Sequence, residues 1–195
     1  MTAYMYANPR CAFVRIPKTA STSIMEAFFD KSTAKADGPL PSKRMWSYTK
    51  SFAFVRHPVS RFRSIKAMFA ERGLLPRYEA PKEWRDPTTE QILELVDNRD
   101  YRLSKVNYLE VMKIHAIPMT HGYFSLDKVE RIFRYEKMDE EWDNLAGYLG
   151  VEPPNMNALN VSKIPVELTK EEINMIQDFY KEDMKVFRYK RISLI

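Results

Sequence analysis

A lysine and four hydroxyl-bearing residues lie together in residues 17–23, which have the sequence PKTASTS. Lysine supplies a full positive charge, and serine and threonine hydroxyls donate hydrogen bonds to phosphate oxygens. An apolar run precedes the segment, and apolar residues at helical spacing follow it. The N-terminus of a helix carries unpaired N–H groups and a partial positive charge. This strand–loop–helix pattern therefore predicts an anion site.

The segment contains no glycine. Phosphate loops need glycine where φ is positive or where the backbone comes very close to the anion. A tighter turn would not need it, so the absence of glycine does not exclude a phosphate site. The standard nucleotide-triphosphatase loop is excluded, because its lysine immediately precedes the hydroxyl residue, whereas Lys18 comes four residues before Thr22. A Ser/Thr-capped helix beside a solvated lysine is an equally favoured alternative for this segment alone.

A second strand-to-helix turn carries an arginine. Arg56 ends the apolar run SFAFVR, Pro58 follows, and a helical pattern begins. A guanidinium can bind phosphate with two parallel hydrogen bonds. Ser64 lies eight residues after Arg56, roughly two helical turns along the chain. Taken alone, the segment favours the simpler alternative of a surface ion-pair arginine and an exposed helix serine.

Strand and helix patterns alternate along the chain. Strands are predicted at 11–16, 51–56 and 129–135, and helices at 22–30, 59–70, 88–97, 139–149 and in a long stretch that opens at the capping-box pair Thr169 and Glu172. Residues 111–119 are ambiguous. The alternation predicts an α/β protein with a parallel sheet flanked by helices. Ligands bind beyond the carboxyl ends of such strands, where turns 17–22 and 57–60 would lie.

The composition limits the classes of protein to which the chain can belong. With 195 residues, 45% of them hydrophobic and 29% charged, the chain fits one soluble globular domain over residues 1–195. No apolar run is long enough to span a bilayer, and no signal-peptide pattern opens the sequence. The single cysteine cannot form an internal disulfide, so we expect a reducing cytoplasm. The net charge of +5 suggests an anionic partner.

The two phosphate-type segments, in this order, resemble the PAPS-dependent sulfotransferases, where PAPS is 3′-phosphoadenosine 5′-phosphosulfate. The resemblance is closest to the carbohydrate branch, which includes the heparan sulfate 2-O-sulfotransferases. VRIPKTASTSI is similar to that family's PKTA(G/S)TS loop for the 5′-phosphosulfate. FVRHPVSRFRS is similar to its 3′-phosphate pattern (F/V)-x-R-(D/x)-P-x-x-R-x-x-S. Similar C-terminal segments extend the resemblance over residues 11–189.

The resemblance implies a P-loop-like sulfotransferase fold and specific residue roles. A phosphosulfate loop spans 16–24, a 3′-phosphate motif spans 54–64, and the variable region 71–118 shapes the acceptor site. Lys18 would lie at the oxygen that bridges phosphate and sulfate, and no metal is needed. The implied nucleotide-binding residues are Pro17, Lys18, Thr19, Ala20, Ser21, Thr22, Ser23, Arg56, Ser64, Asn160 and Lys163.

The acceptor hydroxyl needs a general base. By the same resemblance His115 is favoured over His121, because KIHAIPM is similar to the family's H-x-x-P-Q segment with methionine in place of glutamine. His57, which stands where aspartate is usual, would lie near the 3′-phosphate and could donate a hydrogen bond to it. Glu26 is a further candidate base, and purely structural histidines are the alternative.

Two other functions stay open. A protein that binds the bisphosphate product PAP without transferring sulfate would not need a charge at the bridging oxygen, which Lys18 supplies. A basic nucleic-acid-binding protein would fit the net charge of +5. The sequence contains no known nucleic-acid-binding module, so we expect no nucleic-acid partner. A carbohydrate hydroxyl is the expected acceptor. The membrane-anchoring helix of Golgi family members is missing from the sequence, so we expect a soluble, cytoplasmic member.

Overall fold

The structure of the chain is a computed structural model that describes residues 3–29, 35–36, 46, 50–73, 82–84, 86–97, 108–156 and 164–193. The chain divides into two compact units. The sheet unit comprises Met1–Arg56 and Met119–Val161, and the helical unit comprises His57–Pro118 and Ser162–Ile195. A single domain over the whole chain stays a prediction.

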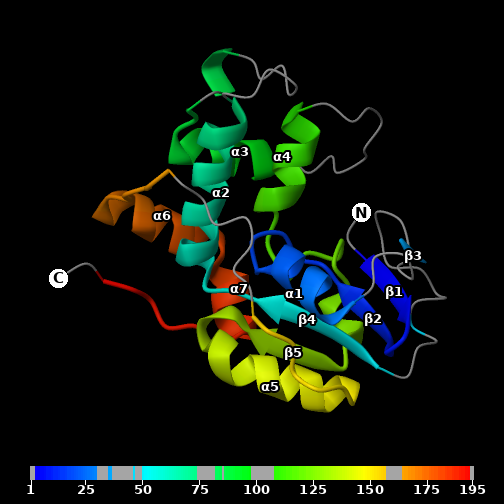
Figure 1. Ribbon diagram of the computed structural model, residues 1–195. Helices are drawn as coiled ribbons and strands as arrows, with labels where there is room; N and C mark the ends of the chain where they lie inside the picture. Colours follow the sequence, from blue (N-terminus) through cyan, green and yellow to red (C-terminus); the bar gives the residue numbers. More distant parts are fainter. Residues whose placement is uncertain are drawn as a thin grey trace. The chain divides into compact units, whose positions relative to one another are not determined.

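The sheet unit contains a five-stranded sheet in the order β3-β1-β2-β4-β5. The bounds of its strands are β1 Ala3–Ala7, β2 Arg10–Val14, β3 Lys35–Ala36, β4 Ser51–Val55 and β5 Arg131–Arg134. β2, β4 and β5 run parallel, whereas β1 pairs antiparallel with β2 and β3 (Figure 1). The three parallel strands are those that the sequence predicts, which confirms the α/β class. β1 and β3 were not predicted.

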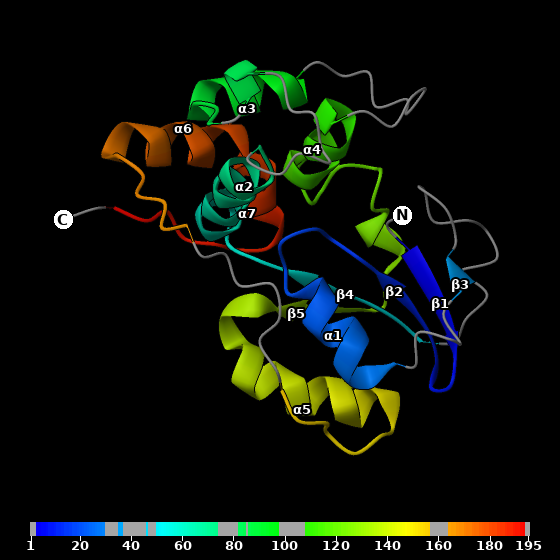
Figure 2. The ribbon, with the colours of Figure 1, turned by 45° about the horizontal axis from the view of Figure 1, so that its top comes forward.

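One face of this sheet is covered by two helices, α1 (Ser21–Phe28) and α5 (Met138–Leu149), which lie on the same side of the strands (Figure 2). Aromatic rings fill the layer between these two helices and the sheet. Phe13 and Phe52 stack with centroids 4.6 Å apart, and Phe28 meets Trp142 edge-on at 4.7 Å. All five residues of β4 are buried, as expected of a central parallel strand. Short 3₁₀ turns at Leu126–Lys128 and Tyr135–Lys137 flank β5.

The helical unit contains five α-helices among its described residues. Their bounds are α2 Pro58–Gly73, α3 Thr89–Asp97, α4 Tyr108–Ala116, α6 Lys170–Phe179 and α7 Lys181–Val186, with a 3₁₀ turn at Lys82–Trp84. The ambiguous segment 111–119 is therefore helical up to Ala116. The long C-terminal helix predicted from the sequence is instead two helices that meet at Tyr180, whose buried hydroxyl donates to the carbonyl of Ala116.

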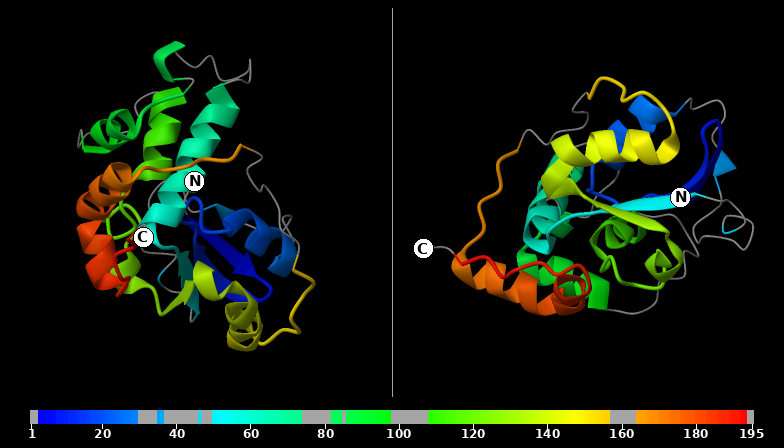
Figure 3. Two further views of the ribbon diagram at one scale, coloured as in Figure 1. Left: turned by 90° about the vertical axis from the view of Figure 1, so that its left-hand side faces the viewer. Right: turned by 90° about the horizontal axis from the view of Figure 1, so that it is seen from below.

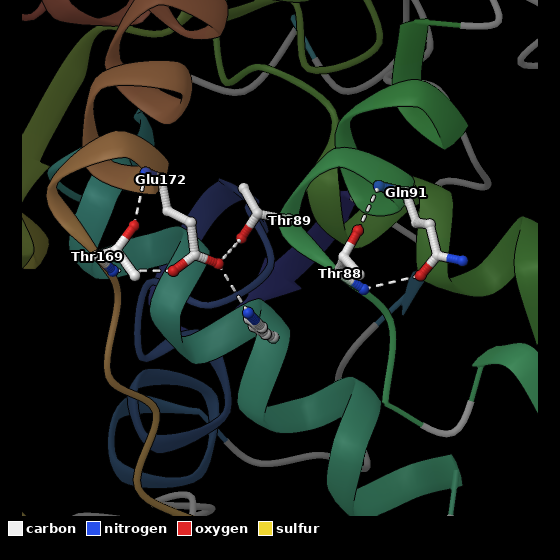
Figure 4. A network of polar contacts seen from close by, with 6 residues as sticks. Thr88, Thr89, Gln91, Thr169 and Glu172 are labelled. Carbon is white, nitrogen blue, oxygen red and sulfur yellow. Dashed lines mark hydrogen bonds and ion pairs between the residues drawn. The ribbon is translucent and has the colours of Figure 1, made fainter.

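A half-buried carboxylate joins three helices of this unit. Glu172 Oε1 accepts hydrogen bonds from Lys66 Nζ of α2 at 2.9 Å and from Thr89 Oγ1 of α3 at 2.5 Å. Its Oε2 accepts the backbone N–H of Thr169 at 2.8 Å, and Thr169 Oγ1 accepts the N–H of Glu172 (Figure 4). The predicted capping box is confirmed. Thr88 caps α3 by the same kind of bond.

The C-terminal segment returns along α6, as the red and orange ribbons of Figure 3 show. Gln177 bonds the backbone of Ile192 twice, and Arg191 pairs with Asp178 at 2.6 Å. Within the described part of the chain, none of the helices is long and apolar enough to cross a bilayer.

Candidate functional site

The carboxyl edge of the parallel strands carries the first group of predicted site residues. Val14 pairs with Ala53 and Val55 pairs with Arg134, so the ends of β2, β4 and β5 lie side by side. β2 continues into the loop at 15–20, β4 into Arg56, and β5 into Tyr135. Such an edge is where parallel α/β sheets bind ligands.

The loop has left-handed backbone at two residues, Lys18 with φ 70° and Ala20 with φ 60°. The loop thus forms without glycine, although two residues that carry side chains adopt positive φ. Each such residue costs roughly 1–2 kcal/mol. Left-handed residues in a turn direct successive backbone N–H groups into one concavity, which is the geometry of phosphate-binding loops.

No hydroxyl-bearing residue occupies the N-cap position of α1. Its N-cap is Ala20, which makes no side-chain cap bond, so the interpretation of this segment as a Ser/Thr-capped helix is wrong. Thr19 is fully buried and donates its hydroxyl hydrogen to the carbonyl of Ile16 at 2.9 Å. Ser21 and Ser23 are buried at the start of the helix, whereas Pro17, Lys18 and Thr22 are half-buried.

Arg56 lies against the loop. Its Nη1 donates to the carbonyl oxygen of Lys18 at 3.2 Å, and its guanidinium stacks on the ring of Tyr135 with 4.0 Å to the ring centroid. The structure therefore brings together the start of the predicted 3′-phosphate motif and the predicted phosphosulfate loop. Tyr135 was not predicted as a site residue, although it directly follows the third predicted strand.

Arg15 was also missed. It directly follows β2, and its guanidinium donates to two hydroxyls in the first turn of α1, from Nε to Ser21 Oγ at 3.0 Å and from Nη2 to Thr22 Oγ1 at 3.2 Å. The sequence did contain a hint of it, because Arg15 is a lone charge in an apolar run that leads straight into the loop.

The rest of the predicted 3′-phosphate motif belongs to the helical unit. Both ring nitrogens of His57 are engaged there: Nδ1 accepts the N–H of Val59 at 3.2 Å, and Nε2 lies 3.0 Å from the carbonyl oxygen of Lys190. The expectation that His57 could donate to phosphate is therefore not supported, because the ring caps α2 instead. Ser64 is half-buried on α2.

Arg61 is 1% exposed, and its guanidinium donates to the carbonyls of His115 and Ile117, both at 2.9 Å. This arginine thus holds the C-terminal end of α4, where the partial negative charge of the helix dipole favours a cation. His115, the favoured base, lies half-buried in the last turn of α4. Its role as the base stays a prediction.

The other candidates differ in environment. His121 Nδ1 accepts the N–H of Tyr123 at 3.0 Å, and burial lowers the pKa of His121. Glu26 is exposed on α1. Asn160 and Lys163 lie outside the described residues, as do parts of the acceptor region 71–118. Among the residues that the structure describes, no three His, Cys, Asp or Glu side chains gather into a metal-binding group.

Comparison with known proteins gives one match. A family model described as the sulfotransferase family matches residues 4–190. The matched range includes the loop, Arg56, Ser64 and His115. Neither the curated proteins nor the solved structures contain a match to the chain.

Proposed function

The chain belongs to the sulfotransferase family, and we propose that it transfers the sulfuryl group of PAPS to a carbohydrate hydroxyl. The observation that carries the proposal is the loop at the carboxyl edge of the sheet. There the left-handed residues Lys18 and Ala20 precede the uncapped N-terminus of α1, and Arg56 bonds the loop from the neighbouring strand end. Backbone amides and cations gathered in this way suit a polyanionic nucleotide.

In the proposed reaction the acceptor oxygen forms a bond to sulfur while the bond from sulfur to the bridging phosphate oxygen breaks. The acceptor proton passes to a general base, for which His115 is the candidate, and PAP leaves with the electron pair of the broken bond. Negative charge thus develops on the bridging oxygen. A lysine placed there stabilises that charge in the transition state more than in the ground state. We assign this role to Lys18.

The nucleotide would be held by the amides and hydroxyls of residues 19–23 at its 5′-phosphate and by Arg56 and Ser64 at its 3′-phosphate. Pro17 would fix the direction in which the chain leaves β2. Asn160 and Lys163 stay predicted contacts that close over the nucleotide. The residues proposed here need no metal for the transfer. Cytoplasmic location stays a prediction.

The proposal is tested by calorimetric titration of the chain with PAP and PAPS, and by turnover of labelled PAPS against candidate glycans. We expect both nucleotides to bind and one class of glycan to become labelled. Lys18→Ala should lower turnover roughly a hundredfold to a thousandfold, as removal of one transition-state contact does elsewhere. Lys185→Ala, at an exposed position on α7, is the matched control and should leave turnover unchanged.

Three outcomes separate the alternatives. Should the wild-type chain bind neither PAP nor PAPS, the sulfotransferase proposal fails. Binding of PAP without turnover of PAPS on any acceptor would favour a nucleotide-binding protein. A strongly salt-dependent affinity for DNA or RNA at physiological ionic strength would favour a nucleic-acid-binding protein. Full turnover by Lys18→Ala would show that the role assigned to the lysine is wrong.

A further inference from the structure

The guanidinium of Arg15 contacts two hydroxyls in the first turn of α1. Nε lies 3.0 Å from Ser21 Oγ and Nη2 lies 3.2 Å from Thr22 Oγ1. A guanidinium has hydrogen-bond donors only, so both hydroxyl oxygens must accept from it. A hydroxyl carries a single hydrogen, which must then be directed away from Arg15. The arginine therefore leaves each hydroxyl to donate to a group on the side away from the guanidinium.

The surroundings of these hydroxyls indicate what they donate to. They stand in the first turn of α1, where N–H groups lack intrahelical acceptors. Ser and Thr at a helix start commonly accept from these N–H groups, but the N-cap here is Ala20 and makes no such bond. Amides and hydroxyls are thus presented together at this helix end, which suits an anion rather than a cation.

The positive charge of Arg15 also indicates that an anion binds here. Within the described part of the chain, no carboxylate forms an ion pair with this half-buried guanidinium. A partly buried cation is stabilised by an anion nearby, and an anion bound across the hydroxyls would supply one. Arg56 brings a second cation to the same loop through its bond to Lys18.

We propose that Arg15 is a positioning residue for the 5′-phosphate of the nucleotide, acting through Ser21 and Thr22. It holds both hydroxyls as donors and adds positive charge behind them. The inference rests on the proposed function, because it assumes that the loop binds a 3′,5′-bisphosphorylated nucleotide. It goes further in assigning recognition of one phosphate of that nucleotide to a residue outside the PKTASTS loop.

The test compares two ligands, PAP and adenosine 3′-phosphate, which lacks the 5′-phosphate. Arg15→Met should weaken PAP binding about tenfold to a hundredfold, the range expected for loss of charge-assisted bonds. Binding of adenosine 3′-phosphate should change less than twofold. A merely structural role for Arg15 would weaken both ligands alike, so the ratio of the two dissociation constants is the decisive quantity. Calorimetry measures both.

Three further variants test the interpretation. Arg131→Met makes the same change at an exposed position at the opposite end of the parallel strands and should leave both affinities unchanged. In a Ser21→Ala, Thr22→Val background, Arg15→Met should weaken PAP binding less than in the wild type, because its effect passes through those hydroxyls. Arg15→Lys, which keeps the charge without the planar fork, should be intermediate, and it replaces Arg15→Met if that variant does not fold.

The outcomes are distinguishable. Failure of the wild-type chain to bind PAP would overturn the proposed function together with this inference. If the wild type binds PAP and the Arg15 variants bind it equally well, or lose both ligands in proportion, the inference alone is overturned. An equal effect of Arg15→Met with and without the two hydroxyls would show that the arginine does not act through them.

Discussion

Removing the charge of Glu172 should loosen the helical unit in a measurable way. Its carboxylate accepts hydrogen bonds from three elements: Lys66 of α2, Thr89 of α3, and the backbone of Thr169 at the start of α6. The side chains of the ion pair are only 17% and 19% exposed, so solvent screens it less than a surface pair. Glu172→Gln keeps the shape of the side chain, removes its charge and replaces one acceptor oxygen by an NH2 donor.

The expected loss of unfolding free energy follows from the hydrogen bonds that Glu172→Gln changes. In Glu172→Gln the amide oxygen can still accept the N–H of Thr169, since glutamine also forms a capping box. Its NH2 group then takes the place of Oε1, so the ion pair with Lys66 is lost and the Thr89 hydroxyl must turn to accept a neutral bond from the amide. Hydrogen bonds to charged groups contribute about 1.5–3 kcal/mol and neutral ones about 1 kcal/mol. We expect the free energy of unfolding to fall by about 1.5 kcal/mol, and the Tm by roughly 3–6 °C.

The loss should depend on pH. Burial by itself raises the pKa of Glu172, but the hydrogen bonds from Thr89, Thr169 and Lys66 and the charge of Lys66 outweigh burial and hold the pKa below its usual value. A lowered folded-state pKa means that the stabilisation is fully present above the unfolded-state pKa of about 4.3. It is lost as the pH falls through the folded-state pKa. The gap between wild type and variant should therefore be constant from pH 6 to 8 and narrow below about pH 4.

Urea unfolding followed by circular dichroism at several pH values measures this gap. Glu171→Gln makes the same change one residue earlier, at an exposed position in the same helix turn, and should cost less than about 0.5 kcal/mol. An equal loss in the two variants would show that the helix dipole, rather than the three-helix network, explains the effect. A gap that does not narrow in acid would contradict the lowered pKa.

Substitutions at three other positions test separate features. Ala20→Gly should stabilise the chain by roughly 0.5–1 kcal/mol in urea unfolding, because φ at this position is 60°; a clear loss of stability would contradict the left-handed loop. Trp142→Phe should lower the free energy of unfolding by about 1–2 kcal/mol, since its indole N–H donates to the carbonyl of Pro154 at 2.7 Å; no change in Tm would refute this. His57→Asn keeps an acceptor for the N-cap bond of α2 but loses the contact with Lys190, so it should lower the free energy of unfolding by about 1 kcal/mol. His57→Ala loses both contacts and should lower it by about twice that. Equal losses in urea unfolding of the two variants would argue against the N-cap bond.

The parallel strands and most helices could be predicted because their patterns are local. An apolar run of five or six residues bounded by Pro or charge marks β2 and β4, and the capping-box pair marks the start of α6. β1 escaped prediction because its mixed AYMYA sequence gains its strand conformation from pairing with β2. The break at Tyr180 escaped because a buried contact with Ala116, far away in the sequence, accompanies it.

In the candidate site, too, some features follow from local sequence and others from tertiary structure. The sequence by itself determined the residue types and their order: a lysine and hydroxyls after one strand, and an arginine after the next. Only the tertiary structure decided that Arg56 reaches the Lys18 carbonyl and stacks on Tyr135, and that Arg15 holds Ser21 and Thr22. The physical reason is the pairing of the strands. Parallel pairing brings the ends of β2, β4 and β5 to one edge, and local sequence patterns do not specify which strands become neighbours.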